Sequence, residues 1–321
     1  MSFFDMDYKS DWWKGEGSPL LKSPLPGPRS KEIFAKGAPF TSLTGRASLC
    51  PVVFEHGVGP WLTDVDGNRF LDLSSGIYVT SLGHSHPRVS SAVASYAGKL
   101  MNCHDYMTEI RALYFEKLAS TMGPGMDYIH IYDNGSTAVE FAIRAARSIT
   151  GRYEIITLFQ DHHGKTMGAA ALGRMNTSHN TGRTQGFYTV PRPDTYRPLW
   201  RREDGSVDVE QYLSFYEQFI LESTTGNVAA FVVEPIQGWG GTVVYPDDFL
   251  PKLSAFCRQR GILLVADEIL TGAGRTGKWL ATEHWGVKPD IVTLLPGGFE
   301  RLAVAEVVHA LPETRVLVGH E

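Results

Sequence analysis

The sequence predicts an α/β fold with a mainly parallel central sheet. From about residue 85 onward, segments with helical periodicity alternate with short apolar runs, a pattern typical of strands joined by crossover helices. Two of these runs, residues 231–233 and 262–266, are each followed directly by a carboxylate. Because open α/β sheets bind ligands beyond the carboxyl ends of their strands, we expect the functional site at that edge.

The bulk properties exclude several classes of protein. The chain has 321 residues, of which 43% are hydrophobic and 20% are charged, as in an ordinary globular protein with one large domain and a smaller lobe. A net charge of -5 without a dense basic run argues against a nucleic-acid partner. Three widely spaced cysteines indicate neither a disulfide framework nor a zinc ribbon. With no signal peptide and no apolar span, we expect a cytoplasmic protein that does not enter the membrane.

Residues 1–75 predict an N-terminal arm followed by a hairpin. Residues 15–40 are rich in Pro, Gly, Ser and Lys, so we expect an extended arm there rather than a packed element. Residues 61–73 alternate apolar and polar side chains around Asp66-Gly67, which is typical of a hairpin.

Residues 76–294 predict the large domain, and residues 295–321 form an atypical tail with the pattern of a helix and a short strand. The helices expected in the large domain cover residues 90–101 and 138–149, and the strands cover residues 128–132, 154–158, 230–233, 262–266 and 291–294.

The first chemical motif is a Gly-Ser turn before the helix at residues 138–149. Gly135 and Ser136 there would expose unpaired backbone N–H groups, a hydroxyl donor and the positive end of the helix dipole. Such a turn can bind a phosphate group. A helix N-cap without a ligand is the commoner use of the same residue types.

The second motif, residues 162–166, follows the strand at residues 154–158. A ring at His162 or His163 could stack on a flat heterocycle, and Gly164 permits close approach of the backbone. Paired histidines more often decorate a loop. We expect no metal here, because no third ligand lies at helical spacing, and the same holds for His84 and His86.

The third and fourth motifs lie at strand ends. Glu234 and Gln237 follow residues 230–233, where Pro and Gly end the strand, although a loop carboxylate is usually only solvated. Asp267 and Glu268 close the strand at residues 262–266, where an acidic residue is costly to bury without a cationic partner. A protonated ring nitrogen would be such a partner.

Residues 272–278 also match two nucleotide-binding patterns. A P-loop needs Ser or Thr after its lysine to hold magnesium, but Trp279 follows Lys278. A dinucleotide site needs an acidic residue at the end of the next strand, whereas Asp290 precedes that strand. A nucleotide-binding enzyme using Gly272 to Lys278 is therefore the least favoured alternative.

Taken together and in this order, the motifs resemble the class III pyridoxal-phosphate-dependent aminotransferases. The resemblance runs from about residue 35 to Leu294 and rests on residues 67–72, 83–87, 135–136, 163–164, 234–238 and 267–277. It implies the large domain of the PLP-transferase fold type I, with an N-terminal arm and a hairpin from the small lobe, and with the C-terminal lobe missing. It also implies a pyridoxal 5'-phosphate cofactor, amine and 2-oxo acid substrates, and a homodimer.

The resemblance assigns a role to each candidate site residue. Gly135 and Ser136 would hold the cofactor phosphate. His162, with His163 beside it, would stack on the pyridine ring, and Ile269 would pack on the ring's other face. Asp267 would pair with the pyridinium nitrogen and keep it protonated. Glu234 and Gln237 would line the site near the substrate.

Three positions depart from the family pattern. Most relatives carry Phe or Tyr where this chain has His162, which weakens stacking. Leu270 stands where Gln is frequent. Relatives that act on 4-aminobutyrate carry Glu in place of Trp239, so we do not expect that substrate.

The gravest departure concerns the Schiff-base lysine. Pro296 occupies its position, and no lysine follows Lys288. Without this amine, the covalent link to the cofactor and the general base are both lost. We therefore predict a transaminase by family with little or no activity. The alternative is a non-catalytic fragment that binds the cofactor or dimerises. A frameshift near codon 295 would explain the tail and the truncated C-terminus.

Overall fold

The computed structural model describes residues 17–41, 50–100, 102–123, 125–126, 128–173, 184–295 and 303–308, and for the last of these segments the backbone alone. The chain divides into two compact units, Met1–Cys103 with Gly297–Glu300, and His104–Pro296 with Arg301–Glu321. The division at Cys103 lies further along the chain than the boundary after residue 75 that we expected. Most of the tail from residue 295 onward, including Pro296, lies outside the described residues.

The described elements of the first unit are α1 (Pro28–Gly37), η1 (Ala38–Phe40), β1 (Phe54–Val58), β2 (Trp61–Asp64), β3 (Arg69–Leu71), α3 (Ser75–Tyr78) and α4 (Pro87–Ala97). Those of the second unit are α5 (Glu109–Met122), β4 (Tyr128–Tyr132), α6 (Gly135–Thr150), β5 (Glu154–Leu158), α7 (Met167–Ala171), β6 (Phe187–Val190), α8 (Val209–Ser223), β7 (Val228–Val233), β8 (Ile236–Gln237), β9 (Val243–Val244), α9 (Phe249–Arg260), β10 (Leu263–Glu268), η2 (Ala281–Trp285), β11 (Ile291–Leu294) and β12 (Ala303–Val308).

The predicted hairpin is present in the first unit, but the prediction of an extended arm over residues 15–40 is wrong. Strands β2 and β3 pair antiparallel around the expected turn. The arm contains helix α1, which has Pro28 in its first turn, where proline's fixed φ suits a helix. Asp66 in the hairpin turn accepts hydrogen bonds from the backbone N–H groups of Arg29 and Ser30. This contact caps the helix and packs it against the hairpin.

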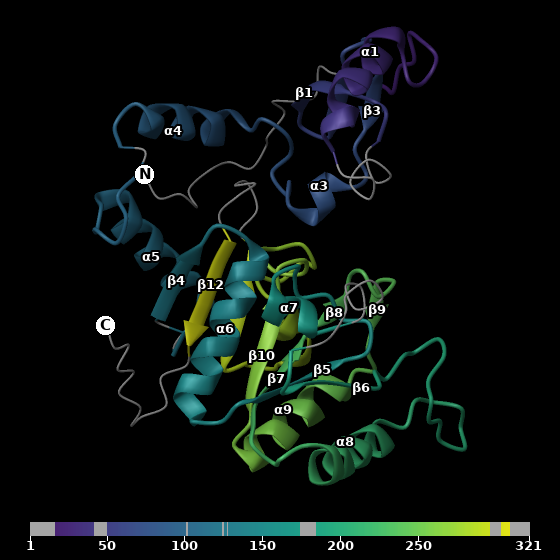
Figure 1. Cartoon of the computed structure of the whole chain (residues 1–321), viewed down its shortest axis with the longest axis vertical. Coiled ribbons are helices and arrows are strands. Elements are labelled where there is room, and N and C mark those ends of the chain that lie inside the picture. Colours follow the sequence, from purple (N-terminus) through teal and green to yellow (C-terminus); the bar gives the residue numbers. More distant parts are fainter. Residues whose placement is uncertain are drawn as a thin grey trace. The chain divides into compact units, whose positions relative to one another are not determined.

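A seven-stranded sheet in the order β4-β12-β11-β10-β7-β5-β6 forms the centre of the second unit (Figure 1). Neighbouring strands from β11 to β6 run parallel, as predicted. Strand β12 runs antiparallel to both β11 and β4, so β4 has the same direction as the parallel strands. The predicted α/β fold with a mainly parallel sheet is confirmed.

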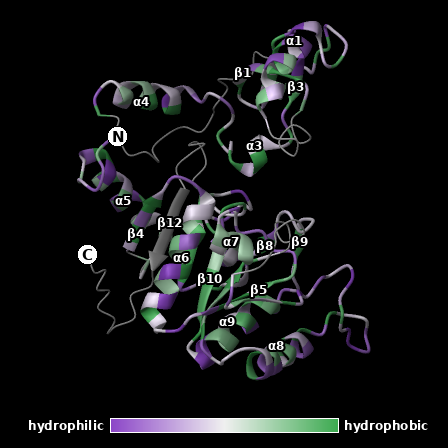
Figure 2. Cartoon of the chain, in the orientation of Figure 1, coloured by the Kyte–Doolittle hydropathy of each residue, from purple (hydrophilic) through white to green (hydrophobic). Residues whose placement is uncertain are grey.

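Helices cover both faces of this sheet. The side chains of β7 alternate between the faces: Phe231 packs with α8 and α9, whereas Val232 packs with α6 and α7. In β5 Ile156 and Ile155 divide in the same way. Because these strands are buried on both sides, they read as continuous apolar runs. Figure 2 shows the central strands as mainly hydrophobic, whereas α6 and α8 also carry hydrophilic residues.

The parallel strands bring distant parts of the chain to one edge. Strands β4, β5, β7, β10 and β11 all end at the carboxyl edge. The polar side chains singled out in the sequence follow β4, β5 and β7 or close β10. The candidate side chains therefore lie at the edge where open α/β sheets bind ligands. In the part of the chain that is described, no helix has both the length and the apolar character needed to cross a bilayer.

Helix α6 begins at this edge with a side-chain cap, which gives a test of the fold. The side-chain oxygen of Asn134 accepts a hydrogen bond of 3.0 Å from the backbone N–H of Thr137. We expect Asn134→Ala to lower the free energy of unfolding by about 1 kcal/mol, because this donor loses its partner. Chemical denaturation measures the change. Asn134→Ser, which restores a capping oxygen, should recover most of the loss, and equal losses in both variants would contradict the prediction.

Candidate functional site

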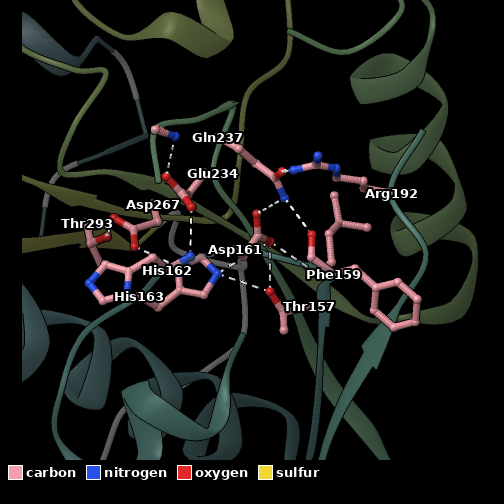
Figure 3. A network of polar contacts seen from close by, with 12 residues as sticks. Thr157, Phe159, Asp161, His162, His163, Arg192, Glu234, Gln237, Asp267 and Thr293 are labelled. Carbon is pink, nitrogen blue, oxygen red and sulfur yellow. Dashed lines mark hydrogen bonds and ion pairs between the residues drawn. The ribbon is translucent and has the colours of Figure 1, made fainter. Parts of the chain in front are cut away.

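Asp267, at the end of β10, is the centre of a buried polar network (Figure 3). Only 4% of the residue is exposed. Its Oδ1 accepts hydrogen bonds from the hydroxyl of Thr293 at 2.8 Å and from the backbone N–H of Ile269 at 3.2 Å. Its Oδ2 lies 2.7 Å from Nδ1 of His163. Partners on β11, in the turn after β10 and in the loop after β5 therefore fix the orientation of the carboxylate.

His163 is buried between two carboxylates. While Nδ1 contacts Asp267, Nε2 lies 3.0 Å from Oγ1 of Thr157 and 3.5 Å from Oδ2 of Asp161. The Thr157 hydroxyl donates to Asp161, so it presents a lone pair to Nε2. Both ring nitrogens thus face acceptors, which assigns the imidazolium form. Burial opposes this charge, but hydrogen bonds to Asp161 and Asp267 and their charges outweigh it and raise the pKa of His163 to about 10.

Asp161 is fully buried and accepts hydrogen bonds on both oxygens. Its Oδ2 accepts from the Thr157 hydroxyl at 2.8 Å and from the backbone N–H of Leu158 at 3.1 Å. Its Oδ1 accepts from the Gln237 amide at 2.5 Å. Both oxygens of Asp161 accept hydrogen bonds and the His163 cation lies beside Oδ2, an arrangement that stabilises the ionised carboxylate. Asp161 and Asp267 with the His163 imidazolium therefore carry one net negative charge, and we call these three residues the carboxylate–imidazolium cluster.

Glu234 ties the loop after β5 to the loop after β7. Its Oε1 accepts from the backbone N–H of His162 at 2.7 Å, and its Oε2 accepts from that of Gly238 at 3.0 Å. Burial and the nearby charge of Asp161 raise the pKa of Glu234 to about 8. This carboxyl group therefore binds two loops together and is mostly protonated at neutral pH.

The predicted ring-contact residue His162 is only half-buried, unlike its neighbour. Its ring meets that of Trp239 edge-on, with the centroids 5.6 Å apart. Burial and the adjacent His163 charge lower the pKa of His162, so this ring is neutral at pH 7. The structure thus places the two histidines in different environments, one inside the polar network and one at its rim.

Gln237 is fully buried, and its amide group is engaged on both sides. The NH₂ group donates to Asp161 and to the Phe159 carbonyl, and the amide oxygen accepts from Arg192. Arg192 also pairs with Asp194 at 2.7 Å. The structure therefore places Gln237 between the carboxylate–imidazolium cluster and an arginine that the sequence did not single out.

The helix turn at Gly135 and Ser136 lies beside the end of β10. A Cβ atom added at Gly135 would lie 3.3 Å from the Ile269 side chain. The Ser136 hydroxyl oxygen accepts a hydrogen bond of 3.0 Å from the backbone N–H of Lys165, which leaves its hydrogen as a donor. A Cβ at Gly164 would lie 2.6 Å from the same oxygen, so only glycine permits this approach. The predicted phosphate turn and the Asp267 strand end are therefore neighbours.

Glu268 and the glycine-rich segment after it have a structural role. Glu268 is fully buried and accepts hydrogen bonds from the hydroxyl of Thr271 and from the backbone N–H groups of Ala281 and Thr282, at the start of η2. Residues 269–280 form turns, and no α-helix begins at Lys278. A P-loop or a dinucleotide-binding turn leads into such a helix, so this segment does not support nucleotide binding.

The other histidines give no metal site within the described residues, where no group of three or more His, Cys, Asp or Glu side chains could hold an ion. In the first unit, Nε2 of His84 contacts Asp72 at 2.7 Å. His86 precedes α4, which begins at Pro87 rather than at residue 90 as we expected.

Comparison with known proteins identifies the family. A profile described as aminotransferase class-III matches residues 44–308. An alanine/serine racemase from Pyrococcus horikoshii is 31% identical, with 88% of this chain and 62% of that protein covered. An acetylornithine aminotransferase from Methanosarcina acetivorans is 32% identical, with 89% and 68% covered. The crystal structure of taurine:2-oxoglutarate aminotransferase from Bifidobacterium kashiwanohense, in complex with PLP and glutamate, is similar with a TM-score of 0.78 and 26% identity, and 87% and 65% of the two chains are covered.

The fold and the strand-end site define a fold type I large domain of the kind found in pyridoxal-phosphate-dependent transaminases. This chain belongs to the class III aminotransferase family. It spans about two thirds of the length of these relatives. The family match continues to Val308 and includes β12, so the resemblance does not end at Leu294, where the sequence analysis placed its end.

The carboxylate–imidazolium cluster gives a test by pH. Because the pKa of His163 rises from 6.5 to about 10 on folding, the folded chain binds this proton more tightly than the unfolded chain. The resulting stability is fully present below pH 6.5 and is lost as the pH rises through 10. We expect the free energy of unfolding to fall over this range in the wild type and to fall much less in His163→Gln.

Urea denaturation at several pH values measures this dependence. His284→Gln changes an exposed histidine in the same unit and should keep the wild-type slope. The raised pKa of Glu234 adds a decline of the same sign between pH 4.5 and about 8, which is common to both variants. A wild-type slope in His163→Gln would refute the assignment of the imidazolium.

Proposed function

We propose that this chain is a pyridoxal 5'-phosphate-binding member of the class III aminotransferases with little or no transaminase activity. The observation that carries the proposal is the adjacency of Gly135 and Ser136 to the Asp267 strand end. A phosphorylated, cationic heterocycle needs an anion-binding turn and a carboxylate a few ångströms apart, and these residues provide both.

The charge of the site fits this cofactor. The two carboxylates and one imidazolium of the carboxylate–imidazolium cluster leave one net negative charge in a buried place. One pyridinium would neutralise it. Asp267 Oδ2 has a single hydrogen-bond partner among the described residues, His163, so it retains an acceptor position for a ring N–H group.

The residues around Asp267 would bind the remaining parts of the cofactor. The Ser136 hydroxyl and the first N–H groups of α6 would donate to the phosphate, where the helix dipole favours negative charge. Ile269 would pack on one face of the ring and His162 would lie on the other. Glu234 would keep His162 in place through the backbone, and Gln237 would support the floor of the site through Asp161.

The same residues cannot replace a catalytic lysine. Pyridoxal phosphate, when bound, supplies an electron-withdrawing pyridinium that stabilises negative charge on a substrate carbon. Transamination also needs an amine that links the protein covalently to the cofactor and that, once freed, acts as a general base. Pro296 has no side-chain nitrogen, and its placement lies outside the described residues. We therefore expect binding without turnover, and a non-catalytic cofactor-binding or dimerising role is the second candidate function.

The substrate class is proposed from the family, as an amino donor with a 2-oxo acid acceptor. Relatives named as racemases and as aminotransferases are about equally similar to this chain, so similarity alone does not select the reaction. Trp239, half exposed beside His162, would form an apolar wall near the substrate. A site wall of this kind favours an apolar substituent over a second carboxylate.

We also propose that the chain forms a homodimer through the surface around α5. Tyr106, Met107, Ile110 and Leu113 are large apolar residues with between 45% and 78% of their area exposed. Clustered exposed apolar side chains mark interaction surfaces, and homodimer interfaces are apolar. Light scattering should give the mass of two chains, and Leu113→Asp should shift it toward one chain. A single-chain mass for the wild type would exclude the dimer.

The proposed cofactor binding is tested by absorbance. Added pyridoxal phosphate should bind with a shifted aldehyde spectrum. Dialysis after borohydride treatment should remove the reduced cofactor, because Pro296 stands where the family has its Schiff-base lysine. Assays with common amino donors and 2-oxo acids should show no turnover at ordinary enzyme rates. A borohydride-fixed cofactor or normal turnover would contradict the proposed loss of function.

Asp267→Asn is the matched variant for this experiment. It keeps the shape of the side chain but removes the charge that pairs with the ring, so we expect the affinity for pyridoxal phosphate to fall by about 10- to 100-fold. Asp290→Asn, at the opposite end of the neighbouring strand β11, should leave the affinity unchanged. Equal affinity of the Asp267→Asn and wild-type chains would place the cofactor elsewhere.

A further inference from the structure

Asp161 is a buried carboxylate that the proposed chemistry does not use directly. It follows β5 after a two-residue turn, and no part of it is exposed to solvent. An ionised carboxylate in such a place is costly unless it is fully paired. Closing the loop after β5 does not require a buried carboxylate, so we looked for a further role of Asp161.

The chain holds Asp161 in place from several sides. A Cβ atom at Gly173, whose φ is +124°, would lie 1.9 Å from the Asp161 carbonyl oxygen, so the backbone passes where only glycine fits. The Leu158 N–H and the Gln237 amide fix the two carboxylate oxygens. The Thr157 hydroxyl then connects Asp161 to Nε2 of His163. These contacts aim the Asp161 charge at His163.

The charge of Asp161 changes the net charge that the site presents to a cation beside Asp267. If His163 and Asp267 were alone, the imidazolium would neutralise the carboxylate, and a pyridinium would enter a site with no net charge. With Asp161 on the far side of the ring, His163 is paired twice, and the cluster keeps one negative charge in surroundings where an unscreened charge interacts strongly. That charge is the one that a ring N–H⁺ would meet.

We propose that Asp161 is a positioning residue of the cofactor site: it holds His163 as an imidazolium and offsets the charge of that ring, so that one negative charge remains at Asp267 for the pyridinium nitrogen. The inference rests on the proposed cofactor binding. The other titratable groups around His163 are Glu234 at the end of β7 and the adjacent His162, with Lys165 close to His162. Among the carboxylates of the described residues, only Asp161 and Asp267 lie within 4 Å of the His163 ring nitrogens.

The first experiment follows the His163 ring by ¹⁵N NMR in the chain without ligand, with His163→Gln used to assign its signals. In the wild type the ring should stay doubly protonated well above pH 8. In Asp161→Asn its midpoint should fall by about 1–3 pH units, the range expected when an opposite charge is removed. Thr157→Val keeps both charges and removes the bridging hydroxyl, so its midpoint should fall less.

Glu154→Gln is the matched control, because Glu154 is a buried carboxylate at the other end of the same strand. It should leave the His163 midpoint unchanged while it tests the general effect of losing a buried charge on β5. An unchanged midpoint in Asp161→Asn, or the same shift in Glu154→Gln, would overturn the proposal.

The second experiment compares two ligands, pyridoxal phosphate and its analogue with C–H in place of the ring nitrogen. Asp161→Asn should weaken pyridoxal phosphate by about tenfold or more, since each pKa unit corresponds to a tenfold change, and should leave the analogue unaffected. An equal loss for both ligands would mean that Asp161 only shapes the site and would overturn the inference. If the wild-type chain bound neither ligand, the cofactor proposal would fail, and the NMR titration would still decide whether Asp161 holds the His163 charge.

Discussion

The contact of a buried imidazolium with two carboxylates is the constraint on which the carboxyl edge of this sheet depends. Strand β7 lies between β5 and β10, so His163 reaches from the loop after β5 across the end of β7 to Asp267. Asp161, on the same loop as His163, pairs with the other nitrogen of the imidazolium. Buried charges are tolerated only when each has partners, so the loops must close in the one arrangement that pairs all three groups. Glu234 strengthens this closure, because it joins the same loop to the end of β7.

Much of the fold could be predicted from the sequence, because the signals were local. The strands β5, β7 and β10 are buried on both faces, so each forms a short, mainly apolar run that is visible in the sequence. The helix starts were less accurate. Both α1 and α4 begin at a proline, which suits the first helical turn. We expected an extended arm at Pro28 and a helix that begins only at residue 90. The cap that Asp66 supplies to α1 comes from a distant turn and leaves no local signal.

The partners within the site could not be predicted in the same way. A cation was expected beside Asp267 from the cost of burying a carboxylate, and the ring of a cofactor was the candidate. The structure supplies His163 as one such cation, from 104 residues earlier in the chain. Adjacent histidines look alike in a sequence, and only the turn of the loop decides that His163 points inward while His162 stays at the rim. Thr157, Asp161 and Arg192 escaped notice because single polar residues at strand ends usually face solvent.

In the proposed function, the groups that would bind the cofactor and the group that would react with it belong to different segments of this chain. The turn at Gly135 and Ser136, proposed for the phosphate, and the carboxylate–imidazolium cluster, proposed for the ring, lie between residues 133 and 293. By the resemblance, the amine of the family would come from position 296, two residues after β11. A proline at this position would remove a nucleophile and a base but none of the charges or N–H groups proposed to hold the ring and its phosphate. The proposed affinity without covalent attachment therefore rests on the separate locations of these two sets of groups.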